Sequence, residues 1–288
     1  KIKKKIPIIF SSTTKVEKKK SIYGMSKNKS KNLIKKFLKK KKINYSIIRF
    51  PNIFGKWSKP NYNSFVATIC YNLPRNRQVK ILNNNYLDLI YVDHAVDILE
   101  KEIKKFILNK NYFKIIKIKK TYKIKLLDLY DKIKNLYNFT LSKRVPNLKN
   151  RFDKNLCSTI VSFLPKEKYI NNIKSFKDDR GVFLEFSKSN YSGQISYLTI
   201  NPKKSRGFHY HNSKYEKFLV LDGNLTFVSK DLYNKKVTKT KLDSSNFKFI
   251  YSIPGHLHYL ENRSKKICKV LLWANENYDI KKPDTYQL

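Results

Sequence analysis

Cysteine and long apolar runs are both scarce in this chain of 288 residues. Its three cysteines (Cys70, Cys157 and Cys268) lie far apart without a CxxC pair, so neither a disulfide framework nor a thiolate zinc site is supported. No window approaches the roughly 18 apolar residues of a membrane span. The apolar run after the basic first residues is too short for a signal peptide. We therefore expect a cytoplasmic protein in a reducing compartment, without membrane insertion.

Acidic residues are also few, with 21 against 63 basic ones and a formal net charge of +42. Such a charge makes nucleic acid a candidate partner. However, only eight basic residues are arginines, which are the preferred readers of guanine and phosphate. The lysines run through every segment beside abundant Asn, Ile and Tyr, as is typical of a genome rich in A and T. We expect no specific nucleic-acid partner, and a basic nucleic-acid-associated protein is the least favoured alternative.

Apolar residues, by contrast, make up 41% of the chain, and its length favours two domains. The first part alternates strand-like and helix-like segments, which predicts a parallel α/β sheet. The expected strands cover residues 6–10, 43–50 and 86–92, and the expected helices cover 23–41, 64–73, a stretch from about 93, and 123–137.

After about residue 165 the pattern changes to short strand candidates separated by Gly, Pro, Asn and Asp. They cover residues 182–186, 194–200, 217–221, 224–228, 247–253 and 269–274, with no long helical pattern between them. This pattern of short strands and turn residues predicts an all-β barrel or sandwich. The expected domains are residues 1–165 and 166–288.

The segment YGMSK places Tyr23 and Lys27 four residues apart, on one face of the expected helix. A free tyrosine has a pKa near 10, and a neighbouring lysine favours its phenolate form. A hydroxyl from the end of the preceding strand, at Thr13 or Ser12, can hydrogen-bond the reacting oxygen. These groups predict a carbonyl/alcohol proton-transfer site. The alternative is that Tyr23 only packs and Lys27 is solvated, because the chain has 20 tyrosines and many lysines.

The segments FSSTT, YGMSK and RFPNIFG resemble the extended short-chain dehydrogenase/reductase family, which includes nucleotide-sugar epimerases and reductases. The resemblance implies a Rossmann-like fold with NADP as cofactor. It makes Tyr23 the acid/base and Lys27 the residue that orients the nicotinamide ribose. Thr13, with Ser12 as the alternative, would polarise the substrate.

The same resemblance places Pro51 and Asn52 in the loop that faces nicotinamide and sugar, and Asn63 in the nucleotide-sugar contact region. The family's G-x-x-G-x-x-G phosphate loop is absent, since no three of the seven glycines have that spacing. Without this loop the backbone amides that cradle the cofactor pyrophosphate are missing. We therefore expect an incomplete Rossmann-like domain, from truncation or gene decay, and weak or absent NADP binding.

Four of the five histidines fall in GFHYHNSKYEKFLVLDG (207–223) and PGHLHYLEN (254–262). On a strand, His209 and His211 would project to the same face. With Glu216 and a later histidine they offer nitrogen and oxygen ligands suited to zinc, manganese, iron or nickel. The spacing resembles the two cupin motifs, which implies that His209, His211, Glu216 and His258 are the metal ligands. Internally bonded or solvated histidines are the alternative, and His256 competes with His258.

Together, FPNIFGKWSKPNYNS, DDRGVFLEF, GFHYHNSKYEKFLV and KKPDTYQL resemble a family of bifunctional capsular-polysaccharide enzymes of the UDP-N-acetyl-L-fucosamine pathway. This implies a homodimer whose cupin domain binds zinc and epimerises C3 of a UDP-4-keto-6-deoxy-hexosamine. The reductase domain would then reduce the C4 ketone with NADPH. The runner-up reading is a cupin-only isomerase or sugar-binding relic with an inactive reductase half.

Overall fold

The computed structural model describes residues 6–14, 22–109, 111–142 and 144–288. The contacts divide the chain into two compact units. The N-terminal unit comprises Lys1–Tyr137 and Leu148–Tyr169, and the C-terminal unit comprises Asn138–Asn147 and Ile170–Leu288. No helix in the described part of the chain combines the length and the apolar character needed to cross a membrane.

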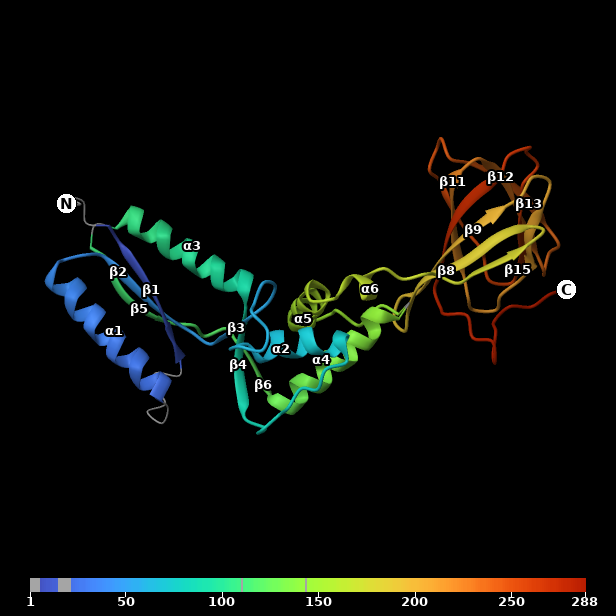
Figure 1. The fold of residues 1–288 in the computed structure, drawn as a ribbon. Coiled ribbons are helices and arrows are strands. Elements are labelled where there is room, and N and C mark those ends of the chain that lie inside the picture. The colour runs from blue at the N-terminus through green and yellow to red at the C-terminus, as the bar shows by residue number, and fades with distance from the viewer. Residues whose placement is uncertain (1–5, 15–21, 110, 143) are drawn as a thin grey trace. The chain divides into compact units, whose positions relative to one another are not determined.

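The N-terminal unit alternates strands and helices, which confirms the predicted α/β class (Figure 1). Three parallel strands form a sheet in the order β1-β2-β5. A second sheet has the order β3-β4-β6, in which β6 is antiparallel to β4. The elements are β1 (Ile8–Thr13), α1 (Ile22–Lys40), β2 (Tyr45–Phe50), β3 (Asn52–Phe54), α2 (Phe65–Asn72), η2 (Leu73–Arg75), β4 (Tyr86–Tyr91), α3 (Val92–Leu108), β5 (Phe113–Lys117), β6 (Tyr122–Lys125), α4 (Leu126–Leu141), α5 (Arg151–Ser162) and α6 (Lys166–Tyr169).

The central strand of the first sheet shows why its sequence forms a strand. β2 reads YSIIRF, and its Ile47 and Ile48 are fully buried on opposite faces. Ile47 packs in a cluster with Leu38 and Ile34 of α1, so these two side chains of the lysine-rich helix face the sheet. Helix α2 begins after Ser64, whose side chain accepts a hydrogen bond from the backbone N–H of Ala67.

A buried carboxylate fixes one face of β2 to α3. Glu102 of α3 is only 2% exposed and accepts hydrogen bonds from Ser46 Oγ, Tyr112 OH and Lys105 Nζ, at 2.9, 2.9 and 2.6 Å. Burial alone would raise the pKa of Glu102, but these three donors hold it below its usual value. The ionised carboxylate therefore stabilises the packing of α3 against β2.

Two predicted boundaries in this unit are wrong. The first strand, expected over residues 6–10, extends to Thr13, because Ser12 and Thr13 continue its pairing with β2. The helix expected over 123–137 begins only at Leu126. The residues before it form β6, where pairing with β4 outweighs their helical spacing.

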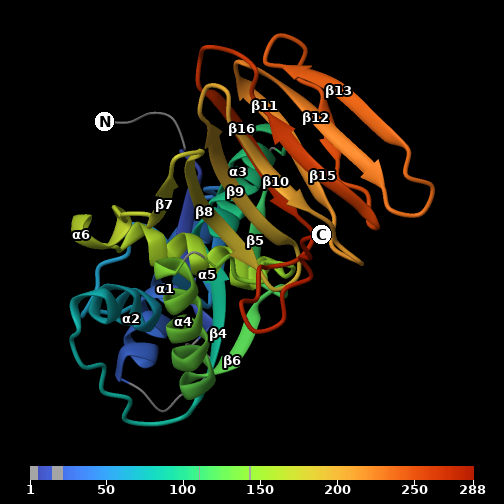
Figure 2. The ribbon, with the colours of Figure 1, turned by 90° about the vertical axis from the view of Figure 1, so that its right-hand side faces the viewer.

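The C-terminal unit consists of two facing antiparallel sheets, as predicted for a cupin-type β domain (Figure 2). One sheet has the order β14-β11-β16-β9-β8-β7 and the other β10-β15-β12-β13. Their apolar side chains form one core, exemplified by Phe218 and Val270 from the first sheet and Phe227 and Leu260 from the second. The strands are β7 (Ser175–Asp178), β8 (Gly181–Ser189), β9 (Gly193–Ile200), β10 (Ser205–His209), β11 (Glu216–Asp222), β12 (Asn224–Asp231), β13 (Val237–Asp243), β14 (Phe249–Tyr251), β15 (His256–Glu261) and β16 (Cys268–Ala274).

Candidate functional site

Three histidines and a glutamate meet inside the C-terminal unit. His209 ends β10, His211 follows it, Glu216 begins β11 and His258 lies in β15. One ligand atom from each lies within 4.8 Å of the others. Nε2 of His258 is 3.3 Å and Nε2 of His211 3.5 Å from Oε2 of Glu216. The structure thus brings together all four residues that the sequence indicates as metal ligands.

The strand that leads into the HxH segment is irregular, whereas the predicted alternation assumes a regular strand. The register of β10 against β15 shifts between Gly207 and His209, and Phe208 has a φ of 61°. Gly207 has a φ of 118°, and a Cβ on it would lie 2.7 Å from the carbonyl oxygen of His258. A β-bulge, made possible by a glycine, therefore sets the direction in which His209 points.

Hydrogen bonds orient the imidazole of His211. Its Nδ1–H donates to the backbone carbonyl of Asp284, at 2.5 Å. A carbonyl oxygen only accepts, so the proton lies on Nδ1 and the lone pair of Nε2 faces the cluster.

His256, the competing histidine, bonds Ser229 Oγ through Nδ1 at 3.1 Å and has its Nε2 3.7 Å from a carboxylate oxygen of Asp231. It does not belong to the cluster.

The protonation of the cluster suits a divalent cation. Burial lowers the pKa of His209 to about 4, so its imidazole is neutral at pH 7. Burial alone would raise the pKa of Glu216, but the hydrogen bond with Nε2 of His258 and the charge of Lys214 hold it well below its usual value. Nε2 of His209 and Nε2 of His211 are buried and make no hydrogen bond in the described part of the chain. The neutral imidazole of His209 beside an ionised carboxylate fits the nitrogen and oxygen ligand set of zinc and similar metals.

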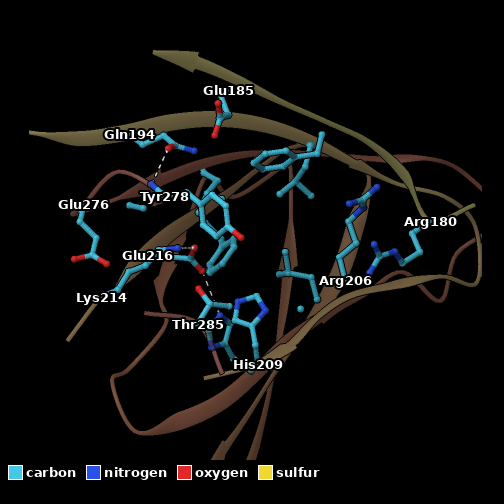
Figure 3. Close-up of a pocket in the computed structure, with 18 of the residues that line it drawn as sticks. Arg180, Glu185, Gln194, Arg206, His209, Lys214, Glu216, Glu276, Tyr278 and Thr285 are labelled. Carbon is cyan, nitrogen blue, oxygen red and sulfur yellow. Dashed lines mark hydrogen bonds and ion pairs between the residues drawn. The ribbon is translucent and has the colours of Figure 1, made fainter. Parts of the chain in front are cut away.

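Three residues of the cluster, His209, Glu216 and His258, line a cavity of about 350 Å³ between the two sheets (Figure 3). Lys214 is 8% exposed, and its Nζ lies 3.4 Å from Oε1 of Glu216. Tyr278 also lines the cavity, and its backbone N–H donates to the side chain of Gln194. Side chains that hold or exchange protons therefore surround the space in front of the cluster.

Asp284 is a structural partner of this site that no sequence motif indicates. Its carboxylate accepts hydrogen bonds from the backbone N–H groups of Asn212, Ser213 and Lys214, at 2.7–2.9 Å, and from Ser213 Oγ. Burial alone would raise the pKa of Asp284, but these donors hold it well below its usual range. The C-terminal segment thus fixes the loop that carries His211.

A second cavity, of about 1140 Å³, lies in the N-terminal unit. Its lining includes Thr14, Pro51 and Asn52, which follow the carboxyl ends of β1 and β2, and also Asn63. Asn52 donates a side-chain hydrogen bond to the carbonyl of Asp88, at 3.1 Å. Open α/β sheets bind ligands at this edge. The structure therefore brings three of the predicted sugar-facing and cofactor-facing residues into one cavity.

Among its described residues, the structure does not bring the predicted proton-transfer residues together at this cavity. Ser12 is 5% exposed, and its Oγ makes no hydrogen bond within the described residues. Thr13 and Lys27 are partly buried, in β1 and α1. Neither they nor Ser12 line the described cavity. Tyr23 lies in the first turn of α1, and its side chain is outside the described part of the chain.

Comparison with known families finds two matches in this chain. Residues 3–111 match the NAD dependent epimerase/dehydratase family, and residues 176–286 match the polysaccharide biosynthesis C-terminal domain. A Pseudomonas aeruginosa protein, UDP-2-acetamido-2,6-beta-L-arabino-hexul-4-ose reductase, is 32% identical over 282 residues. The alignment covers 98% of this chain and 75% of that relative.

Solved structures show the same similarity in three dimensions. The capsular polysaccharide assembling protein CapF from Staphylococcus aureus is 31% identical, with a TM-score of 0.89 over 99% of this chain and 77% of CapF. A structure of CapF with the inhibitor 3-isopropenyl-tropolone is 29% identical, with a TM-score of 0.85 over 99% of this chain and 79% of that one.

Proposed function

The chain belongs to the family of capsular UDP-sugar reductases with an epimerase-type N-terminal region, and from this we propose that it acts on a UDP-4-keto-6-deoxy-hexosamine. The C-terminal domain, which we place at residues 166–288, epimerises C3 of this sugar. The N-terminal domain, at residues 1–165, serves the reduction of its C4 ketone. The proposal includes a homodimeric, cytoplasmic enzyme, as the family resemblance implies.

The observation that carries the epimerase half is the buried cluster of His209, His211, Glu216 and His258 at the wall of a cavity. Three imidazoles and one carboxylate support a divalent metal at this position, because two of the buried imidazole nitrogens have no hydrogen-bond partner among the described residues. Zinc is the ion that the resemblance implies. A bound divalent ion supplies Lewis-acid charge that favours the enolate form of a keto-sugar, or else holds the cavity wall together.

The chemistry requires little beyond proton transfer. The C4 ketone acidifies the C3 proton, so a base removes it and leaves an enolate. An acid then returns a proton to the opposite face of C3, which inverts that carbon without any net loss of atoms or electrons. The side chains of Lys214 and Tyr278, on the lining of the cavity, are of types that exchange protons.

The described N-terminal unit supports the binding of a sugar more fully than the binding of a dinucleotide. Pro51, Asn52 and Asn63 lie together on one cavity, as expected for a sugar-facing surface. The 288 residues contain no glycine-rich phosphate loop, so they do not make a complete site for NADP. We assign to these three residues the binding and orientation of the sugar, and to Tyr23 and Lys27, with Thr13 or Ser12, the proton that the C4 oxygen receives.

The epimerase proposal is tested by exchange of the C3 proton in heavy water. The zinc-loaded protein is incubated with the UDP-4-keto-sugar in D₂O, and deuterium at C3 is measured by NMR. We expect incorporation by the wild type and by His256→Gln, and loss of incorporation in His258→Gln. An absence of deuterium at C3 with zinc-loaded wild-type protein would refute the assignment of epimerisation to this cavity.

A further inference from the structure

Two arginines line the cavity that holds the His/Glu cluster. Arg206 lies in β10, and Arg180 lies in the turn between β7 and β8. Figure 3 shows their guanidinium groups on a different side of the cavity from His209 and Glu216. The cavity therefore has a metal-ligand side and a guanidinium side.

The two guanidinium groups share one carboxylate. Nη2 of Arg206 donates to Oδ1 of Asp178 at 2.8 Å, while Nε and Nη2 of Arg180 donate to Oδ2 at 3.1 and 2.7 Å. The neighbouring Asp179 pairs with Lys204 at 2.7 Å. These five groups carry three positive and two negative charges, so one positive charge remains in excess. Asp178 thus holds the two guanidiniums side by side without neutralising both.

Arg206 has donor capacity that the fold does not use. Its side chain is only 13% exposed, yet its Nε is buried and makes no hydrogen bond within the described residues. A buried N–H without an acceptor costs free energy, unless a ligand supplies the acceptor. Arginine is also scarce in a chain whose positive charge is mostly lysine. The guanidinium fork matches phosphate oxygens in a way that a lysine ammonium does not.

The β-bulge explains how one strand serves both sides of the cavity. Arg206 and His209 are three residues apart, so on a regular strand they would face opposite sides of the sheet. The extra residue at the bulge brings both side chains to the same face of the sheet, since Arg206 pairs with Leu260 and His209 pairs with His258, two residues apart on β15. Leu260 and His258 both line the cavity.

We propose that Arg180 and Arg206, held together by Asp178, bind the diphosphate of a nucleotide-sugar whose sugar ring lies at the His/Glu cluster. This inference rests on the proposed function for the reaction at the sugar, but the anion subsite itself requires no turnover. A diphosphate supplies acceptors for the free N–H of Arg206 and compensates the excess positive charge.

The experiment uses the full chain at physiological salt, which screens the surface lysines. Amide hydrogen exchange is followed by mass spectrometry, because it distinguishes this cavity from the one in the N-terminal unit. UDP and inorganic pyrophosphate should slow exchange in peptides spanning residues 176–183 and 203–209, and uridine should not. Arg206→Gln and Arg180→Gln should each weaken this protection by about ten- to a hundredfold in ligand concentration.

Arg263→Gln is the matched control, because this exposed arginine pairs with Glu261 and does not line the cavity. It should leave the protection unchanged. If Arg206→Gln does not fold, Arg180→Gln carries the test, since the Arg180 side chain is 48% exposed. Protection by uridine, no protection by UDP, or equal protection in the Arg180→Gln variant would each overturn the proposal. Intact protection by UDP without deuterium at C3 would instead refute the proposed reaction and leave this subsite standing.

Discussion

Replacing Asp284 by asparagine should weaken zinc binding at the His/Glu cluster, although Asp284 contributes no side-chain atom to that cluster. Its carboxylate receives four hydrogen bonds from residues 212–214, at 2.7–2.9 Å, and its carbonyl accepts the Nδ1–H of His211. Asparagine keeps the size of the side chain but turns an acceptor-only group into one that also presents N–H donors to these N–H groups. The loop between His211 and Glu216 therefore loses its anchor.

The magnitude follows from the number and kind of bonds. Hydrogen bonds to a charged group are worth about 1.5–3 kcal/mol each, and the partial exposure of Asp284 reduces this value. Loss of partners that orient a metal-bound histidine typically costs about 10–100-fold in metal affinity. We expect a reduction in that range for Asp284→Asn, measured at pH 7 by competition for zinc with a chromophoric chelator.

Asp279→Asn is the control for this experiment. Asp279 lies in the same C-terminal segment and is exposed, and its carboxylate accepts a hydrogen bond from the backbone N–H of Lys281. Among the described residues, no hydrogen bond or ion pair joins it to the loop that carries His211. Unchanged zinc affinity in Asp284→Asn, or an equal loss in Asp279→Asn, would show that the anchoring of this loop does not position His211.

Three further predictions concern the cluster, the bulge and the N-terminal unit. His258→Gln should lose most of its zinc on dialysis while His256→Gln keeps it, measured as metal content; equal loss from both would contradict the assignment. Gly207→Ala should lower the thermal stability of the C-terminal unit by more than Gly255→Ala. An alanine at either position costs about 1–2 kcal/mol because of the positive φ. At position 207 the added Cβ would also lie within 3 Å of backbone atoms, whereas at position 255 it would meet no atom within 4 Å. Equal melting temperatures of the two variants would contradict this reasoning. Glu102→Gln should cost about 1–3 kcal/mol in the urea-derived free energy of unfolding at pH 7. Because the folded pKa of Glu102 lies below 4.5, its stabilisation is present above that pH and is lost as pH falls through the folded value. A difference in unfolding free energy between wild type and Glu102→Gln that does not shrink as pH falls below 4.5 would contradict this prediction.

The sequence predicts the order of elements well where one physical pattern dominates. The strand-like segment YSIIRF became a buried parallel strand, and the short strands between turn residues became the two antiparallel sheets. The prediction failed where two patterns competed. Residues 123–125 have helical spacing, but a partner strand was available, and pairing with β4 is a tertiary contact that local periodicity does not contain.

The same limit applies to the site. The spacing from His209 to Glu216 and on to His258 was sufficient to indicate the cluster, because all four residues lie in two short motifs. Asp284 lies 73 residues beyond His211, and no local pattern links them. The segments DDRGVFLEF and KKPDTYQL were noted only for their resemblance, and only the folded chain shows that they place Arg180 and Asp284 near the cavity.

The β-bulge in β10 supports both sides of the cavity, and it was not predicted from the sequence. The bulge at Gly207 and Phe208 allows β10 to present Arg206 and His209 to the same space. Both side chains therefore depend on a conformation that only glycine adopts without strain at position 207. A substitution there should disturb the binding of UDP and the binding of zinc together. Substitutions at Arg180 or His258 should disturb only one of the two. If Gly207→Ala weakened zinc binding while UDP protection stayed intact, the bulge would not be the common support of both sides.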